Sequence, residues 1–357
     1  MTERRLMAGN EAAGEGAICA GCRFYYGYPI TPQNELTEYM ARRLAEVGGT
    51  FIQAESELAA INMVYGTAAA GERVMTSSSS PGISLKQEGI SYLAGSELPA
   101  VIINAQRGGP GLGDISPSQS DYFQATKGGG HGDYHIIVLA PYSVQEFADV
   151  IRDAFDLADL YRTPVMILAD GQLGQMMEPV EFAERPTREL PPKNWALTGA
   201  KNERKQNIVK SFYWIKGDLE AFNLRLQAKY AEIQSKEVRF ETYDLEDADI
   251  ALVAYGTSAR ICREVLTLAR ANGVRLGLLR PITLWPFPTE EIQGLAASVE
   301  SFLVVEMSFG QMVEDVRLAV EGRRPVHFYG RGGGAVPTSK EILGEVMRLR
   351  EHREAAG

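Results

Sequence analysis

Short apolar runs alternate with helical patterns along the first half of the chain. Residues 101–104, 136–140 and 165–170 are apolar runs of strand length. Between the last two runs, Ser143 and Glu146 form a capping box ahead of apolar positions that recur every three or four residues. A strand, a capped helix and another strand make a βαβ unit, so we expect a parallel sheet with helices on both faces.

The same alternation returns at about residue 248 and predicts a second α/β domain. Its predicted strands cover residues 250–255, 274–279, 301–306 and 325–329, and its predicted helices cover residues 258–270, 312–320 and 339–348. We therefore expect an α/β protein with two parallel-sheet domains, over residues 1–190 and 248–357, joined by a linker or insertion over residues 191–247.

The predicted linker differs in charge from the rest of the chain. Residues 193–239 hold ten basic and five acidic side chains within an acidic protein. Apolar residues follow helical spacing inside it, at Leu219, Phe222, Leu226, Tyr230 and Ile233. We expect an amphipathic helix that lies across a domain or subunit surface. Two interpretations of the basic side chains are open, a solvated linker face and a binding place for a phosphate-bearing substrate.

Length and charge narrow the class of protein. With 357 residues and 45% hydrophobic content, the chain can bury two hydrophobic cores. Its net charge of −10 argues against nucleic-acid binding, which needs clustered Lys and Arg. No run approaches the ~18 uncharged apolar residues of a membrane span, and the start Met-Thr-Glu-Arg-Arg-Leu lacks the apolar segment of a signal peptide. We expect a cytoplasmic protein with no membrane partner.

Cysteine and histidine usage predicts no metal site on this chain. The three cysteines, Cys19, Cys22 and Cys262, imply no disulfide framework. Two thiolates at Cys19 and Cys22 cannot complete a four-ligand zinc or iron–sulfur site. Their small-residue segment, 12–21, predicts a buried helix, which favours packing over ligation. The four histidines share no metal-binding spacing.

Two prolines flank one hydroxyl in the stretch Tyr-Pro-Ile-Thr-Pro. Proline fixes its own φ angle and restricts the residue before it, so Ile30 and Thr31 are expected to be extended between Pro29 and Pro32, with the Thr31 side chain aimed by the backbone. A second interpretation is a rigid strand-to-helix turn in which Thr31 or Asn34 caps the helix.

Glu57 stands alone at the head of a run of small and apolar residues, 58–71. As a structural residue it would complement the positive end of a helix. In an apolar site it would instead keep a proton available for chemistry. Glu55 is the rival carboxylate, because it lies on the same side of an extended segment as Glu57.

Arg107 follows a predicted strand, which places it at the carboxyl end where open parallel sheets bind ligands. Its planar fork suits a carboxylate, and a surface arginine is the alternative. About 30 residues with eight glycines come next, and loops of that length are lids, binding loops or disordered. Within it, residues 111–116 depart from the dinucleotide fingerprint at the last position, so we reject NAD binding.

Several segments match one known family in order and spacing. They are residues 9–12, 27–33, 55–57, 76–82 and 106–110, and Gly256-Thr257 with Arg280-Pro281. Through them nearly the whole chain resembles the α subunit of the 2-oxoacid:ferredoxin oxidoreductases, in its branched-chain (2-oxoisovalerate-type) branch. The resemblance implies a pyrimidine-type thiamine diphosphate-binding domain followed by a transketolase C-terminal-like domain. It also implies oxidative decarboxylation of a 2-oxoacid with coenzyme A, giving acyl-CoA, CO₂ and reduced ferredoxin.

The resemblance assigns roles to particular residues. Glu57 becomes the catalytic carboxylic acid, hydrogen-bonded to a ring nitrogen of thiamine diphosphate. Arg107 and the Thr31 hydroxyl bind the substrate carboxylate. Ile30 and Ser80 join Glu57 in lining the cofactor site, and for Ser80 a polar turn is the alternative.

The other half of a thiamine site is missing from the sequence. Thiamine enzymes bind the pyrophosphate through a Gly-Asp-Gly motif, but Asp114, Asp133 and Asp218 have glycine on one side only. The resemblance therefore implies that thiamine diphosphate is shared with a β subunit that carries Mg²⁺ and a [4Fe–4S] cluster. Small γ and ferredoxin-like δ subunits are further expected partners, with ferredoxin and coenzyme A.

Three alternatives stay open at the level of the sequence. One is a 2-oxoglutarate- or pyruvate-specific member of the same family. The aromatic residues near Thr31 favour a branched substrate, whereas Arg23 is a candidate second cation for 2-oxoglutarate. Another is a self-contained thiamine enzyme of transketolase type. The last is a non-catalytic scaffold subunit.

Overall fold

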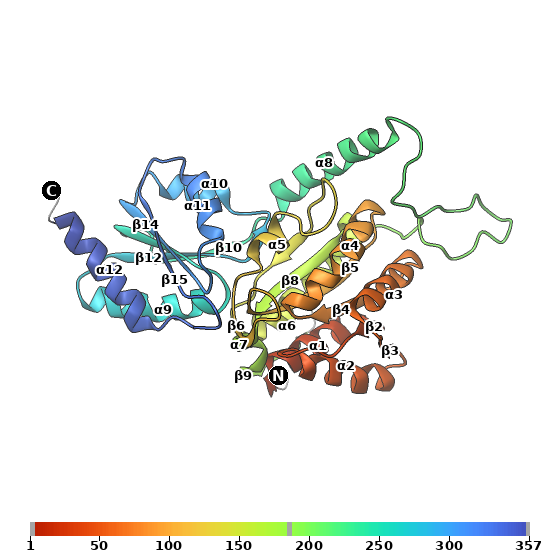
Figure 1. Cartoon of the computed structure of the whole chain (residues 1–357), viewed down its shortest axis with the longest axis horizontal. Coiled ribbons are helices and arrows are strands. Elements are labelled where there is room, and N and C mark those ends of the chain that lie inside the picture. Colours follow the sequence, from red (N-terminus) through yellow and green to blue (C-terminus); the bar gives the residue numbers. More distant parts are fainter. Residues whose placement is uncertain (1–3, 184–187, 355–357) are drawn as a thin grey trace.

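A computed structural model describes residues 4–183 and 188–354 of the chain (Figure 1). Residues 1–3, 184–187 and 355–357, which belong to the predicted first and last domains, lie outside the described residues. Two α/β sheets lie side by side, with the first drawn in red to yellow-green and the second mainly in blue (Figure 1). The α/β fold with parallel-rich sheets is confirmed.

The first sheet has the strand order β13-β7-β8-β5-β4-β2-β3, with β6 paired to β5. Its members are β2 (Phe24–Gly27), β3 (Thr50–Gln53), β4 (Val74–Ser78), β5 (Ala100–Gly108), β6 (Asp114–Pro117), β7 (Ile137–Leu139), β8 (Pro164–Asp170) and β13 (Thr283–Trp285). The three predicted strands are confirmed as β5, β7 and β8. Every residue of β5 and β8 is buried, because helices cover both faces of a parallel sheet.

Helices pack on both sides of this sheet. On one face, α1 (Gly9–Cys19) contacts α2 (Asn34–Glu46) and α6 (Val144–Tyr161). On the other, α3 (Glu57–Ala69) packs against α4 (Ser80–Gly95) (Figure 1). The predicted cap of α6 is confirmed, because Ser143 Oγ accepts a hydrogen bond of 3.2 Å from Glu146 N.

Short elements complete the first domain. They are the antiparallel pair β1 (Arg5–Ala8) and β9 (Met177–Val180), and the helices α5 (Tyr122–Thr126) and α7 (Gly171–Gln175). The glycine-rich stretch after Arg107 was expected to be one long loop, and this was wrong, because it contains β6 and α5. Gln119 ties this stretch to the second half of the chain. Its side chain donates a hydrogen bond to Tyr255 O at 2.8 Å and accepts one from Met307 N at 2.9 Å.

The second sheet has the order β10-β12-β11-β14-β15. Its strands are β10 (Phe240–Tyr243), β11 (Ile250–Val253), β12 (Leu276–Pro281), β14 (Ser301–Glu306) and β15 (Val326–Gly330), and its helices are α9 (Gly256–Ala271), α10 (Thr289–Leu295), α11 (Met312–Val320) and α12 (Ser339–Glu354). The four predicted strands and three predicted helices of this half are confirmed. Helices α9 and α12 pack together, as do α10 and α11.

The two sheets exchange strands near the predicted linker. Strand β10 lies within residues 191–247 but pairs with β12 of the second sheet. Strand β13 lies beyond residue 248 but pairs with β7 of the first sheet. The division at residues 190 and 247 stays a prediction, because pairing across sheets does not follow the order of the sequence.

The predicted amphipathic helix is confirmed as α8 (Asp218–Lys236). Four of its five predicted apolar positions are buried, and Leu219 is the exception at 49% exposed. The helix lies across the first domain (Figure 1), where Lys229 Nζ donates to Glu97 Oε1 at 2.9 Å. Leu219 belongs to the first turn of the helix, beyond this contact.

The cysteine prediction is half correct. The small-residue segment forms the buried helix α1, and Cys22 is fully buried beyond its end, with its pKa raised by burial to about 12. Cys19, however, is exposed, so its packing role was wrong. It is the last residue of α1, where the helix leaves the core.

The described residues contain neither a candidate metal site nor a candidate membrane helix. No group of three or more His, Cys, Asp or Glu side chains among them is placed to hold a metal ion. Within the same part of the chain, no helix has both the length and the apolar content that a membrane crossing requires.

Buried polar contacts join the two domains. Arg280 is fully buried, and its guanidinium donates to Glu146 at 2.8 and 2.9 Å and to Glu241 at 3.1 Å. Asp170 accepts hydrogen bonds from Thr257 N at 3.2 Å and Thr257 Oγ1 at 2.8 Å. Burial raises the pKa of Asp170. Arg280 links β12 to α6 and Asp170 links β8 to α9, so the two contacts hold the two domains against each other.

We predict that Arg280→Met lowers the free energy of unfolding by about 3 to 5 kcal/mol, because it leaves the buried Glu146 carboxylate without its cation. Urea unfolding of the full chain measures this. Arg323→Met is the matched control, since its pair with Glu321 is solvent-exposed and worth less than about 1 kcal/mol. Equal losses in the two variants would contradict the role of Arg280.

Candidate functional site

Glu57 begins α3, and its side chain is 6% exposed. The preceding Ser56 caps the helix by accepting a hydrogen bond of 3.2 Å from Ala59 N. The rival Glu55 is exposed, two residues before the helix begins. The helix frame therefore turns Glu57 inward and leaves Glu55 in solvent.

A glycine makes room for the Glu57 carboxyl. Gly82 lies in the first turn of α4, and a Cβ atom placed there would lie 2.6 Å from Glu57 Oε1 and 2.1 Å from Ser78 Oγ. Neither distance is tolerable for a real side chain. The close approach of α3 and α4 thus depends on glycine at this position.

The Ser78 hydroxyl near this carboxyl and the hydroxyl of the next residue both lack a hydrogen-bond partner within the described residues. Ser78 Oγ and Ser79 Oγ are buried and have no hydrogen-bond partner within the described residues. Both precede α4, at the carboxyl end of β4. Buried polar atoms are nearly always hydrogen-bonded in native proteins, so these atoms point to a ligand or partner group at the site.

The stretch around Thr31 is a turn, not the extended segment that was expected. Gln33 N donates to Ile30 O at 3.1 Å, which closes a four-residue turn through Thr31 and Pro32. The Thr31–Pro32 peptide bond is cis, and a cis-proline suits the second central position of a turn. The second interpretation was right about the turn, which joins β2 to α2. Its cap was wrong, because α2 has Gln33 at its N-cap and no side-chain cap bond.

Arg107 lies within β5, near its carboxyl end, and is 6% exposed. Its Nη1 donates to Thr31 O at 3.0 Å and its Nη2 to Leu112 O at 2.8 Å. Its Nε is buried and has no partner within the described residues. The backbone N of Arg107 donates to Ser80 Oγ at 3.0 Å.

The structure thus brings Thr31, Ser80 and Arg107 together, with Glu57 beside the same turn of α4 that begins at Ser80. Ile30 is half-buried, and its hydrogen bond within the described residues is the backbone contact that closes the turn. It therefore borders the Thr31 turn without a polar contact to Ser80 or Arg107.

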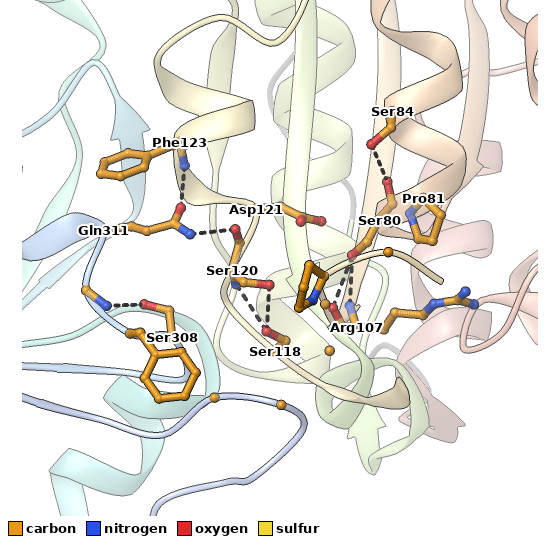
Figure 2. Close-up of a pocket in the computed structure, with 18 residues that line it drawn as sticks. Ser80, Pro81, Ser84, Arg107, Ser118, Ser120, Asp121, Phe123, Ser308 and Gln311 are labelled. Atoms are coloured by element: carbon orange, nitrogen blue, oxygen red, sulfur yellow. Dashed lines mark hydrogen bonds between the residues drawn. The ribbon is translucent and has the colours of Figure 1, made fainter. Parts of the chain in front are cut away.

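A cleft of about 510 Å³ opens between the two domains (Figure 2). Figure 2 shows Ser80 and Arg107 on the side of the first domain and Ser308 and Gln311 on the side of the second. Gln311 joins the two sides, because its Nε2 donates to Ser120 O at 2.6 Å and its Oε1 accepts from Phe123 N at 2.8 Å.

Several cleft residues were missed by sequence reasoning. They are Ser118, Ser120, Asp121, Ser308 and Gln311. The sequence could have indicated Ser308 and Gln311, because they lie shortly after the predicted strand that became β14. Ligands bind at the carboxyl ends of parallel strands. Ser118, Ser120 and Asp121 could not be found in this way, since the glycine-rich stretch that holds them has no periodic pattern. Partial burial raises the pKa of Asp121, whose carboxylate accepts from Asn104 Nδ2 at 2.9 Å.

These features fit one half of a thiamine diphosphate site. A buried carboxyl and nearby buried hydroxyls without a partner within the described residues suit a small planar ring that offers hydrogen-bonding nitrogens. The fold defines the class as a two-domain α/β protein with a cleft between the domains.

Two family models match the chain. One, described as "Pyruvate flavodoxin/ferredoxin oxidoreductase, thiamine diP-bdg", covers residues 15–239. The other, "Pyruvate:ferredoxin oxidoreductase core domain II", covers residues 248–342. The ketoisovalerate oxidoreductase subunit VorB of Methanothermobacter marburgensis is 54% identical over 99% of this chain and 98% of its own length. The chain belongs to the 2-oxoacid:ferredoxin oxidoreductase family, and its resemblance to the ketoisovalerate type is confirmed.

Other comparisons agree with this assignment. The 2-oxoglutarate synthase subunit KorA of the same organism is 37% identical over 98% of the chain and all of its own length. A solved 2-oxoglutarate:ferredoxin oxidoreductase from Magnetococcus marinus matches with a TM-score of 0.85 and 27% identity, over 97% of this chain and 65% of that one. A split-gene transketolase at 14% identity and a TM-score of 0.60 shares the fold alone, over 96% of this chain and 97% of its own.

We predict that Gly82→Ala destabilises the chain by about 1 to 3 kcal/mol, because the new methyl group overlaps the Glu57 carboxyl and the Ser78 hydroxyl. The matched control is Gly66→Ala in α3, where a Cβ atom meets nothing within 4 Å. Alanine there should stabilise the helix by about 0.5 to 1 kcal/mol. Thermal unfolding measures both, and stabilisation by Gly82→Ala would refute the close packing.

Proposed function

We propose that the chain is a cytoplasmic catalytic subunit of a thiamine diphosphate-dependent 2-oxoacid:ferredoxin oxidoreductase. The 2-oxoacid loses CO₂, its acyl group is transferred to coenzyme A, and the two electrons released reduce ferredoxin. The buried Glu57 carboxyl beside Gly82 carries this proposal. Bound thiamine diphosphate supplies the carbanion chemistry of the decarboxylation.

The chain's own residues bind, orient and hold protons. Glu57 would hydrogen-bond the pyrimidine ring of the cofactor through its buried carboxyl. Arg107 binds the substrate carboxylate, with the Thr31 hydroxyl as a second donor. Ser80 supports this geometry, because its Oγ holds the Arg107 backbone. Ile30 covers the cofactor side of the Thr31 turn.

A branched 2-oxoacid is the substrate we propose. The relatives named ketoisovalerate oxidoreductase support it. The candidate second cation for 2-oxoglutarate, Arg23, lies before β2 and donates to Ile18 O at 3.1 Å and Cys22 O at 2.8 Å. The Thr31 turn follows the opposite end of β2, so Arg23 does not reach the substrate from this position.

A partner chain is needed to complete the site. The sequence lacks a pyrophosphate motif, and we propose that a β subunit supplies this half together with Mg²⁺ and a [4Fe–4S] cluster, with γ and δ subunits passing electrons to ferredoxin. Exposed apolar side chains support an interface. Ile208, Phe212, Trp214 and Ile215, which precede α8, are 67% to 86% exposed, and large exposed apolar groups mark association sites.

We predict that Glu57→Gln lowers turnover by about 10² to 10⁴ in the assembled complex, because an amide cannot supply the proton. Turnover is measured as ferredoxin reduction with 2-oxoisovalerate and coenzyme A, and size-exclusion chromatography checks that assembly is intact. Glu55→Gln is the matched control and should leave turnover unchanged, since Glu55 is exposed. Near-normal activity in Glu57→Gln would reject the assignment.

We predict that Arg107→Lys raises KM for the 2-oxoacid by about 10- to 100-fold, because lysine cannot form the paired hydrogen bonds worth roughly 1.5 to 3 kcal/mol. Initial rates against substrate concentration measure this. Arg348→Lys, on the exposed side of α12, controls for the exchange itself. An unchanged KM would exclude Arg107 as the carboxylate ligand.

Measuring activity with and without this chain distinguishes a catalytic subunit from a non-catalytic scaffold. Activity of the β subunit alone, equal to that of the pair, would favour a non-catalytic scaffold. Thiamine diphosphate bound tightly by the purified single chain would favour a self-contained enzyme. Rates with 2-oxoisovalerate, pyruvate, 2-oxoglutarate and arylpyruvates rank the substrates, and preference for 2-oxoglutarate would contradict the branched-chain proposal.

A further inference from the structure

A lysine lies fully buried behind the Glu57 site. Lys86 in α4 has no exposed surface, and its Nζ makes one hydrogen bond within the described residues, 2.7 Å from Thr76 Oγ1 of β4. A charged lysine has three N–H donors, and lysine is almost never fully buried without a paired charge. Its placement therefore needs a reason other than packing.

The residue spacing in helix α4 and in strand β4 places Lys86 near the packing contact between Gly82 and Glu57. Lys86 lies four residues after Gly82 in α4, so the two positions share one face of the helix. Thr76 and Ser78 alternate in β4, so they share one face of the sheet. Gly82 and Ser78 are the residues that touch Glu57 or lie beside it. Lys86 therefore lies one helical turn after the glycine that Glu57 packs against, on the same face of α4.

The charged groups around Lys86 are few. Burial lowers the pKa of Lys86 to about 7, and the negative charge of Glu57 acts in the opposite direction. Elsewhere on α3 and α4, Tyr65 bonds Ser96 and Glu88 bonds Tyr92, both away from the amine. Strand β4 carries no other titratable group, and Arg107 at the end of β5 is bound to backbone carbonyls.

The amine is costly to the fold as it stands. Replacing a buried charged group by an apolar one of similar volume is often neutral or stabilising. Methionine has a similar length and no charge. Retaining lysine where methionine would fit suggests that the amine serves the neighbouring carboxyl, since titratable groups with perturbed environments gather at functional sites.

We propose that Lys86 is a positioning residue for Glu57, whose buried amine sets how readily the carboxyl releases its proton. When the amine is charged, it stabilises the Glu57 carboxylate and makes the carboxyl a better proton donor to the cofactor ring. When it is neutral, Glu57 holds its proton more tightly. The purpose rests on the proposed function, but the coupling between the two side chains does not.

The first test compares the thermal stability of the full chain and of Lys86→Met over a range of pH. Between about pH 7 and about pH 10 the unfolded chain binds a proton at this position that the folded chain has lost. Wild-type stability should therefore rise with pH in that window relative to the variant, by about 2 °C or more in Tm. Lys236→Met on the exposed side of α8 corrects for the loss of one positive charge.

The second test is a double-mutant cycle in the same assay. Glu57→Gln leaves the Lys86 amine without its opposing charge, and Lys86→Met leaves the Glu57 carboxyl without its cation. The changes in Tm should not add, so that the change in the double variant differs from the sum of the two single changes. If Lys86→Met does not fold, Lys86→Gln replaces it, because the amide keeps the contact with Thr76.

The third test uses the assembled complex. Lys86→Met should move the limb of the pH–rate profile that depends on Glu57 upward by about one unit, which is a tenfold change in rate at a fixed pH on that limb. The limb of the pH–rate profile that depends on Glu57 is identified as the one that disappears in the Glu57→Gln complex. A merely structural lysine would lower activity equally at every pH.

The outcomes separate the two proposals. A complex without 2-oxoacid activity would reject the proposed function, and the double-mutant cycle would then decide the coupling alone. Additive changes in Tm, or a Tm difference that does not vary with pH, would overturn the inference about Lys86. An active Lys86→Met complex with an unmoved pH profile would overturn it as well.

Discussion

The close approach of α3 and α4 at Gly82 is the constraint on which the site depends. The Glu57 side chain and the Ser78 hydroxyl occupy the space that a methyl group at Gly82 would fill. Because glycine leaves this space open, Glu57 can begin a helix and still be buried. The same approach directs the amine of Lys86, one helical turn after Gly82, toward Thr76. Packing between two helices thus sets the surroundings of the group that we propose handles protons.

The cleft depends on a second constraint, the fixed contact between the two domains. Arg280 and Asp170 are buried polar groups whose partners lie across the junction. Gln119 adds bonds to Tyr255 and Met307, so the polar segment before α5 is ordered by the second domain. Arg107 and Ser80 then face Ser308 and Gln311 across one cavity (Figure 2). Each domain alone would present only one wall of it.

Much of the fold could be predicted from periodicity. The runs that became β5, β7 and β8 are buried on both faces, and such runs are visible in a sequence because most of their positions are apolar. The failures were local turns. Two prolines left an extended Thr31 and a strand-to-helix turn both open, and the backbone bond from Gln33 to Ile30 decided for the turn. Cys19 belongs to a small-residue helix and is nevertheless exposed, because it is the last residue of that helix.

The sequence by itself determined the α/β class and the family, because residue type, order and spacing are local properties. Only the tertiary structure decided that Glu57 is buried while Glu55 is exposed, and that Arg107 meets the Thr31 turn. It also decided that Lys86 lies behind the same carboxyl. These outcomes depend on how strands far apart in the chain pair and how helices pack over them, which fixes burial and charge contacts that no local pattern encodes.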